Sequence, residues 1–251
     1  MPMPSTMLRS RARSELLRRV SSRIVDVRGA PVFSFTFDDI PASAAGAGAR
    51  LLEDAGVRGT FYVAPGLAGT PEPGSPDDPR ATLDEVAALH ARGHEIGCHS
   101  FSHRRRAAWD SPDDLAADCA RAREVLSGAI GGTPIQHFSY PYGEHSLATK
   151  RLLGNDYATL RLTEGGLNLG RTDVRMLRAE SLYSEGLDRV SMARMIDRCA
   201  AEGGWLVFYT HGVLPRPNRV GISPDDLSWV IERCRGRGEI LTVGNALARF
   251  A

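Results

Sequence analysis

The chain has 251 residues, of which 42% are hydrophobic and 24% are charged, and its formal net charge is +1. This composition is typical of a globular protein and excludes a disordered or fibrous chain. A near-neutral charge gives no global attraction to nucleic acid or to an anionic membrane, so we expect neither as a partner. No stretch of the sequence approaches the ~18 apolar residues of a transmembrane segment.

Residues 1–30 form a basic leader, in which seven arginines face only Glu15 and Asp26, for a net charge of +5. Arginines interrupt its apolar residues throughout, so it lacks the apolar run of a secretory signal. We interpret the leader as a solvated, amphipathic helix, and an arm for a membrane surface or nucleic acid is the alternative. Without a secretory signal, we expect a cytoplasmic protein whose four cysteines are reduced and buried.

From residue 31 onward, short apolar runs alternate with helical patterns. In the first run, period two places Phe33, Phe35 and Phe37 on one face of a strand. Thr82 and Glu85 form a capping box, which predicts the start of a helix. The expected strands are residues 31–37, 57–63, 95–98, 135–140, 156–160, 175–182, 204–210 and 239–243. The expected helices are residues 42–56, a helix from residue 82, and residues 111–128, 145–153, 188–202 and 224–236.

Strands that alternate with helices predict an α/β fold with a mostly parallel sheet. Seven or eight strands in about 220 residues favour a closed or nearly closed barrel, which we expect as a single domain over residues 31–251. Chemistry in such barrels sits at the C-terminal ends of the strands. Reactive side chains should therefore directly follow the apolar runs.

Asp38 and Asp39 directly follow the first apolar run. Two adjacent carboxylates at a buried strand end repel each other, so at least one must be neutralised. A metal ion does this at low cost and leaves the second carboxylate as a base. A helix N-cap followed by an acidic first turn is the alternative for the same pair.

His99 and His103 follow the expected strand 95–98. Their spacing of four lets both imidazoles converge on one ion if the segment turns helically. His94 lies on the strand side of this motif and is expected in the core or on the surface. Two histidines and one carboxylate are a common catalytic metal set, so the His pair and the Asp pair together indicate more than either alone.

Two later strand ends carry further candidates. Pro141 and Gly143 fix a sharp turn that presents Tyr142, and such a turn can aim a backbone N–H at an oxyanion. His211 follows the apolar run 205–210, at a place where a general acid is expected. An ordinary turn with packed tyrosines and a hydrogen-bonded structural histidine are the alternatives.

Together, the segments TFDD, HSFSH, PYG and THG resemble the motifs of the NodB-homology polysaccharide deacetylases, in the family's order over roughly residues 31–245. These proteins are carbohydrate esterases with a distorted (β/α) barrel. The resemblance implies a divalent metal ion, usually zinc with cobalt or nickel as alternatives, that is held by Asp39, His99 and His103.

The same resemblance implies that Asp38 is the catalytic base, that the backbone N–H of Tyr142 stabilises the oxyanion and that His211 protonates the leaving amine. The implied reaction is metal-dependent removal of N-acetyl groups from an amino sugar or a short saccharide. An O-acetyl esterase or another metal amidase with the same site is an alternative, and so is a catalytically inactive, glycan-binding relative.

Some positions depart from the family's pattern. Ile40 stands where many members have Gly, and Tyr209 stands where a Leu often lines the acetyl pocket. Ser139 stands where many members have the arginine that positions the catalytic Asp, and we expect Arg178 to replace that arginine from a neighbouring strand. The family's Asp-rich fourth motif is not recognisable, so Asp173 is the candidate to orient the acid histidine.

Overall fold

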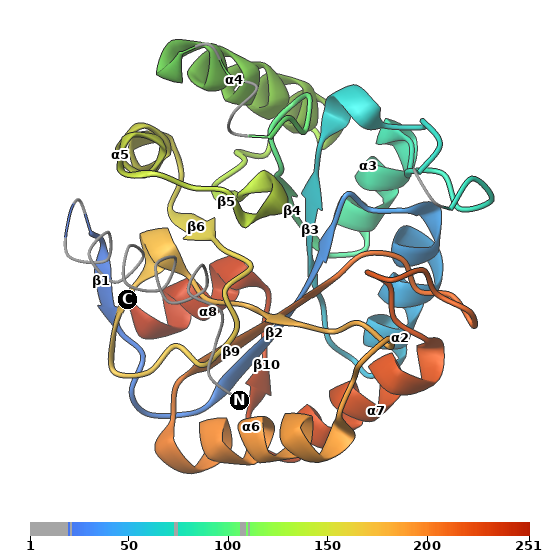
Figure 1. The fold of residues 1–251 in the computed structure, drawn as a ribbon, viewed down its shortest axis with the longest axis vertical. Helices are drawn as coiled ribbons and strands as arrows, with labels where there is room; N and C mark the ends of the chain where they lie inside the picture. Colours follow the sequence, from blue (N-terminus) through green and yellow to red (C-terminus); the bar gives the residue numbers. More distant parts are fainter. Residues whose placement is uncertain (1–19, 21, 73–74, 106–108, 110) are drawn as a thin grey trace.

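A curled sheet of short parallel strands lies at the centre of the molecule, with helices packed around it (Figure 1). The computed structural model describes residues 20, 22–72, 75–105, 109 and 111–251. The strands of the sheet are β2 (Val32–Asp38), β3 (Thr60–Val63), β4 (Glu95–Cys98), β5 (His137–Ser139), β6 (Thr159–Arg161), β8 (Glu180–Ser181), β9 (Trp205–Thr210) and β10 (Glu239–Ile240). They are hydrogen-bonded in the order β6-β5-β4-β3-β2-β9-β8, and β10 pairs with the start of β2.

Seven α-helices lie in the described part of the chain, none of them long and apolar enough to cross a membrane. They are α2 (Ala49–Asp54), α3 (Leu83–Ala91), α4 (Pro112–Ala129), α5 (Leu147–Asp156), α6 (Arg189–Glu202), α7 (Pro224–Arg235) and α8 (Val243–Phe250). Single turns of other helix types are η1 (Ala44–Gly48), η2 (Pro65–Leu67), η4 (Pro141–Gly143) and η5 (Val174–Met176). The predicted capping box starts α3, because the side chains of Thr82 and Glu85 each accept a backbone N–H of the other.

The chain segment 177–181 joins the two edges of the sheet. The N–H of Leu177 donates to the carbonyl of Leu160 (3.0 Å), and the N–H of Leu162 donates to the carbonyl of Leu177 (2.8 Å), so this segment lies beside β6. A few residues later, β8 pairs in parallel with β9. The sheet thereby curls into the distorted (β/α) barrel that was predicted, in a single domain.

The alternation of side chains along β2 decides what faces the inside of the barrel. All seven residues of β2 are buried, because helices cover one face of the strand and the barrel interior lies on the other. Phe33, Phe35 and Phe37 belong to the large core cluster between sheet and helices. Ser34 faces the interior, where it accepts a hydrogen bond from Trp205 Nε1 (2.9 Å). Asp38 has the same parity as Ser34, so β2 ends with a carboxylate that points into the barrel.

The end of the basic leader differs from the prediction of a helix. Residues 24–26 form β1 (Ile24–Asp26), which pairs antiparallel with β7 (Arg171–Asp173). Asp173 helps to fix this pairing, because its Oδ1 accepts the backbone N–H of Arg23 (3.0 Å). The helix prediction is therefore wrong at residues 24–26, and residues 1–19 and 21, where the rest of it falls, lie outside the described residues.

Lys150 and Asp173 form a buried ion pair that connects α5 to this added strand pair. The Nζ of Lys150 lies 2.5 Å from Oδ2 of Asp173 and also donates to the backbone carbonyl of Val20 (2.8 Å). Neither side chain is more than 2% exposed. Removal of one member of such a pair leaves a buried charge without its partner.

We predict that Lys150→Met lowers the free energy of unfolding by about 3–5 kcal/mol, as measured by urea denaturation. The matched control is Arg198→Met, which removes the cation of an exposed pair with Glu202 on α6. That variant should unfold at the wild-type urea midpoint. Equal midpoints for Lys150→Met and the wild type would show that the buried pair does not stabilise the fold.

Candidate active site

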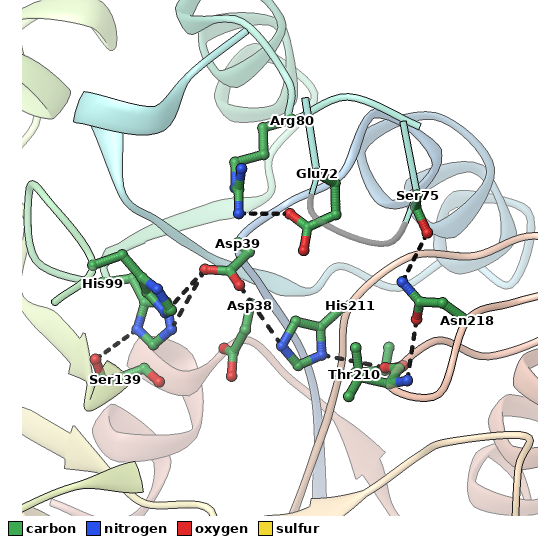
Figure 2. A network of polar contacts seen from close by, with 12 residues as sticks. Asp38, Asp39, Glu72, Ser75, Arg80, His99, Ser139, Thr210, His211 and Asn218 are labelled. Carbon is green, nitrogen blue, oxygen red and sulfur yellow. Dashed lines mark hydrogen bonds and ion pairs between the residues drawn. The ribbon is translucent and has the colours of Figure 1, made fainter. Parts of the chain in front are cut away.

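The C-terminal ends of the parallel strands line one cavity of about 500 Å³. Six residues that the sequence singled out as candidates line it: Asp38, Asp39, His99, His103, Tyr142 and His211. Figure 2 shows how Asp38, Asp39, His99 and His211 face one another across this space. Strands far apart in the sequence thus bring the side chains at their C-terminal ends together. Active sites of parallel barrels lie at this end of the strands.

Asp39, His99 and His103 form a group that fits a metal ion. Their candidate ligand atoms all lie within 4.8 Å of one another. Oδ1 of Asp39 lies 3.2 Å from Nε2 of His103 and 3.8 Å from Nε2 of His99, yet this buried oxygen has no hydrogen-bond partner among the described residues. An unsatisfied buried carboxylate oxygen is costly. A divalent cation that accepts nitrogen and oxygen ligands, such as zinc, would satisfy it.

The surroundings of both imidazoles suit metal binding. Nδ1 of His99 lies 2.7 Å from the carbonyl of Ser139. A proton on Nδ1 makes this hydrogen bond and leaves the lone pair of Nε2 free for an ion. Burial, with the neighbouring His99 as the second cause, lowers the pKa of His103 to about 4, so that side chain is neutral at pH 7.

Left-handed backbone concentrates at this site. The described non-glycine residues with positive φ are Asp39 (57°), Ile40 (37°), Ser100 (60°), His103 (49°) and Tyr142 (58°). Each lies in a turn that follows β2, β4 or β5. Such conformations cost of order 1–3 kcal/mol each and persist only where the surrounding structure imposes them. The position of Ile40 shows why many family members have Gly there, since a β-branched residue strains this turn.

Asp118 on α4 holds the loop that carries the two histidines. Its Oδ2 accepts the backbone N–H of Phe101 (2.7 Å), and its Oδ1 accepts the hydroxyl of Ser102 (2.7 Å). These bonds fix the two residues immediately before His103, whose own N–H donates to Ser100 Oγ (3.0 Å). Asp118 therefore positions one side of the candidate metal site from outside the cavity.

Arg161 is the arginine at the candidate base, and the prediction of Arg178 is wrong. Both carboxylate oxygens of Asp38 accept hydrogen bonds from Nη2 of Arg161, which also contacts Ser139 Oγ. Arg161 of β6 lies directly opposite Ser139 of β5 in the strand register. The small serine leaves room for a guanidinium from the neighbouring strand, so β6 supplies the arginine that the motif resemblance implies at residue 139.

Arg178 lies outside the cavity. Its backbone N–H donates to Oδ1 of Asn168 (3.0 Å), and its guanidinium extends toward the carbonyl of Gly165 (3.4 Å). Arg178 directly follows Leu177, which forms a β-bridge with Arg161. The segment expected to supply the arginine therefore lies beside β6, the strand that does supply it. The side chain of Arg178 itself faces away from Asp38.

The pKa of Asp38 reflects two opposing effects. Complete burial alone would raise the pKa of this carboxyl. The positive charge of Arg161 outweighs burial, so the pKa of Asp38 lies below its ordinary value. Asp38 is therefore an anion at neutral pH and can accept a proton.

His211 is oriented by a backbone carbonyl. Its Nδ1 lies 3.2 Å from the carbonyl of Val220, and its Nε2 lies 3.9 Å from Oδ2 of Asp39. Asp173, the candidate orienter, instead binds Lys150 of α5, so that prediction is wrong. A backbone carbonyl in the loop that follows β9 thus takes the orienting role that was expected of a side-chain carboxylate.

Two aromatic side chains shape the cavity mouth and its inner wall. The ring of Tyr142 is half-exposed and lies 4.7 Å from the ring of His103, while the guanidinium of Arg105 lies over its other side, 3.9 Å from the centroid. Tyr209 lies on the inner wall, where the guanidinium of Arg161 is 4.9 Å from its ring centroid. The backbone of Tyr142 is thereby fixed beside a candidate metal ligand.

His94 is a structural histidine. Its side chain is buried, accepts the backbone N–H of Gly59 at Nδ1 (3.1 Å) and contacts Glu53 Oε1 through Nε2 (2.9 Å). It takes no part in the cavity.

Sequence reasoning missed Arg161, Asp118, Glu72 and Arg80. Arg161 had a usable signal, since a charged residue at the end of an apolar strand needs a buried partner. Glu72 and Arg80 line the cavity from the Pro-rich loop 65–80, whose path the sequence pattern does not determine.

A protein-family model matches the part of the chain that contains most of these motifs. Residues 26–158 match the model of a family described as polysaccharide deacetylase. This range includes Asp38, Asp39, His99, His103 and Tyr142. A comparison with curated protein sequences gives no match.

Solved structures with a similar fold include carbohydrate esterases. A family 4 carbohydrate esterase from Bacillus anthracis is 15% identical with a TM-score of 0.62, over 99% of this chain and 95% of that one. A family 4 acetyl xylan esterase from Clostridium thermocellum, in complex with a cobalt ion, is 23% identical with a TM-score of 0.57, over 87% and 91%. A family 4 carbohydrate esterase from Streptomyces lividans, in complex with acetate, is 15% identical with a TM-score of 0.54, over 86% and 92%. These likenesses establish the fold.

We predict that Asp118→Ala weakens zinc binding roughly 10- to 100-fold, because loss of a supporting carboxylate releases the loop of His103. Competition with a chromogenic zinc chelator measures this affinity. Asp113→Ala, an exposed change on the same helix, is the control and should bind zinc as the wild type does. Unchanged affinity in Asp118→Ala would show that the loop holds its shape without this carboxylate.

Proposed function

The chain belongs to the polysaccharide deacetylase family, and on that premise we propose that it is a metal-dependent hydrolase that removes N-acetyl groups from an amino sugar or a short saccharide. The observation that carries the proposal is the orphaned Oδ1 of Asp39 between two imidazoles, next to an ionised Asp38 and opposite His211. Zinc is the proposed ion, with cobalt or nickel as alternatives. The cytoplasmic location stays a prediction.

Asp39, His99 and His103 would hold the ion on one side of the cavity. When bound, a divalent cation supplies a Lewis acid and lowers the pKa of water from about 15.7 to ~7. Side chains and backbone groups of the protein carry out every other step.

Asp38 is the proposed general base. It is held by Arg161 at the inner end of the cavity, and it is ionised because that guanidinium outweighs the effect of burial on its pKa. It accepts the proton that the attacking water loses. Arg161 prevents the carboxylate from rotating away, so the base keeps its position through the reaction.

Tyr142 acts on the acyl oxygen of the substrate, and His211 acts on its departing nitrogen. The backbone N–H of Tyr142 donates to the oxygen of the acyl group as negative charge develops there. His211 donates a proton from Nε2 to the departing nitrogen while Nδ1 stays hydrogen-bonded to the carbonyl of Val220. Amines leave poorly without a proton, which is why an acid at this place favours an N-acyl substrate.

An O-acetyl esterase with the same residues is the second candidate. The similar Clostridium thermocellum structure is an acetyl xylan esterase, and the same base and oxyanion donor serve an ester. Alkoxides are better leaving groups than amide anions, so an esterase depends less on His211. An inactive glycan-binding relative is disfavoured because both the candidate base and the candidate acid are present in the cavity.

We predict that Asp38→Asn lowers the rate of acetate release from an N-acetylated sugar by roughly 10²–10⁴-fold, since it removes the general base. Acetate is measured by a coupled enzymatic assay with zinc added. The amide keeps the shape of the side chain, so binding of zinc should persist. Turnover at the wild-type rate would exclude Asp38 as the base.

We predict that His211→Ala reduces turnover of an N-acetylated sugar at least about tenfold more than turnover of an O-acetylated one, because the amine needs the proton. The control is His90→Ala, a half-buried histidine on α3 that lies outside the cavity. Equal losses of turnover for the two substrates would exclude His211 as the general acid. They would also remove the reason to prefer an N-acetylated substrate.

A further inference from the structure

An ion pair that the proposed reaction does not use lies in the wall of the same cavity. Oε2 of Glu72 lies 2.8 Å from Nη2 of Arg80, and their side chains are only 11% and 9% exposed. Both residues line the cavity together with Asp39 and His211. Burial of two charges is costly, and no step of the proposed reaction uses this pair.

Arg80 is fixed by its own loop. Its Nη1 donates to the carbonyl of Pro71 (2.9 Å) and contacts Thr70 Oγ1 (3.3 Å), which leaves Nη2 for Glu72. The guanidinium therefore faces Oε2 of Glu72 as its charge partner, and this buried oxygen has no hydrogen bond among the described residues. A planar, always-charged group is suited to this task.

The loop itself is bonded to other rims of the cavity. Ser75 Oγ accepts a hydrogen bond from Asn218 Nδ2 (2.9 Å), and Asp78 accepts the backbone N–H of Ser43 (2.8 Å). The wall that carries Glu72 is thus connected to the turn after β2 and to the loop after β9. This arrangement is preorganised before any ligand arrives.

The second oxygen of Glu72 is directed at the substrate space. Figure 2 shows Arg80 on one carboxylate oxygen of Glu72, while the other oxygen points toward the gap between Asp39 and His211. Arg80 balances the charge of Glu72, so the pair as a whole is neutral. A neutral pair with a free acceptor oxygen is suited to an uncharged hydroxyl group rather than to a cation.

We propose that Glu72 accepts a hydrogen bond from a hydroxyl group of the sugar that carries the acyl group, and that Arg80 is its positioning residue. This inference rests on the proposed function and narrows it. Acyl donors that carry hydroxyl groups next to the reacting centre bind well, and plain acyl esters or amides without hydroxyl groups do not gain this contact. The Glu72–Arg80 pair thereby selects sugars over other acylated amines.

The test compares two acyl donors, N,N′-diacetylchitobiose with hydroxyl groups and p-nitrophenyl acetate without them. Glu72→Ala should raise the KM for the sugar roughly 10- to 100-fold, with a much smaller change in kcat, because the bond is made before and during the reaction alike. The loss in kcat/KM for p-nitrophenyl acetate should be at least about tenfold smaller. Glu72→Gln keeps an acceptor oxygen and should recover part of the sugar's affinity.

Asp77→Ala is the control for a change in the same loop. It removes an exposed carboxylate that does not line the cavity, so turnover of both donors should stay at the wild-type level. An equal effect of Glu72→Ala on both donors, or no effect on either, would overturn the inference.

Failure of the proposed function is separated by direct binding. If the wild type releases no acetate from any N-acetylated sugar, that function is wrong, and calorimetric titration of N,N′-diacetylchitobiose into the full chain still tests Glu72. A Kd that rises roughly tenfold or more in Glu72→Ala would support the inference. An equal Kd in both proteins, or no binding by the wild type, would overturn it.

Discussion

The buried ion pair between Asp38 and Arg161 ties the barrel to its chemistry. Asp38 ends β2 and points inward because of the alternation along a strand whose every residue is buried. A carboxylate in that place requires a counter-charge, and Arg161 supplies it from β6, four strands away in the sheet order. The pair can form only because the sheet curls and brings β6 across from β2. The curl of the sheet therefore also determines where the candidate base lies.

The charges of the site explain why a cation belongs there. Arg161 offsets one of the two adjacent carboxylates, and Arg80 offsets Glu72, so the charge of Asp39 remains. Both neighbouring imidazoles suit a cation: Nδ1 of His99 is hydrogen-bonded to the carbonyl of Ser139, and burial lowers the pKa of His103 to about 4. The strained turns of Asp39 and His103 hold these donors close together. A divalent ion relieves the unsatisfied oxygen that the backbone imposes.

Much of the architecture could be predicted from local pattern. The apolar run with Phe33, Phe35 and Phe37 is a strand because period two and burial agree, and Thr82 caps α3 because its capping box acts within one turn. The pairing of β1 with β7 depends on contacts far apart in sequence, and local pattern does not contain them. The sequence pattern does not predict the helix α8, because the apolar run that contains its first residue favours a strand.

The site was predictable where motif residues directly follow strands, as Asp39, His99 and His211 do. Arg161 was not, because the choice between it and Arg178 depends on the strand register. Ser139 and Arg161 are opposite each other in neighbouring strands, whereas Arg178 lies one residue past the segment that meets β6. Glu72 was missed for a related reason: its loop is placed by hydrogen bonds to distant residues such as Asn218, which no periodicity records.

Zinc titration of metal-stripped protein, followed by both bound zinc and released acetate, tests the central claim most directly. The account predicts one zinc ion per chain and acetate release from an N-acetylated sugar that rises in step with occupancy. It also predicts that His103→Ala folds but loses both together. Acetate release by the metal-stripped protein, or wild-type release by His103→Ala without bound zinc, would contradict it.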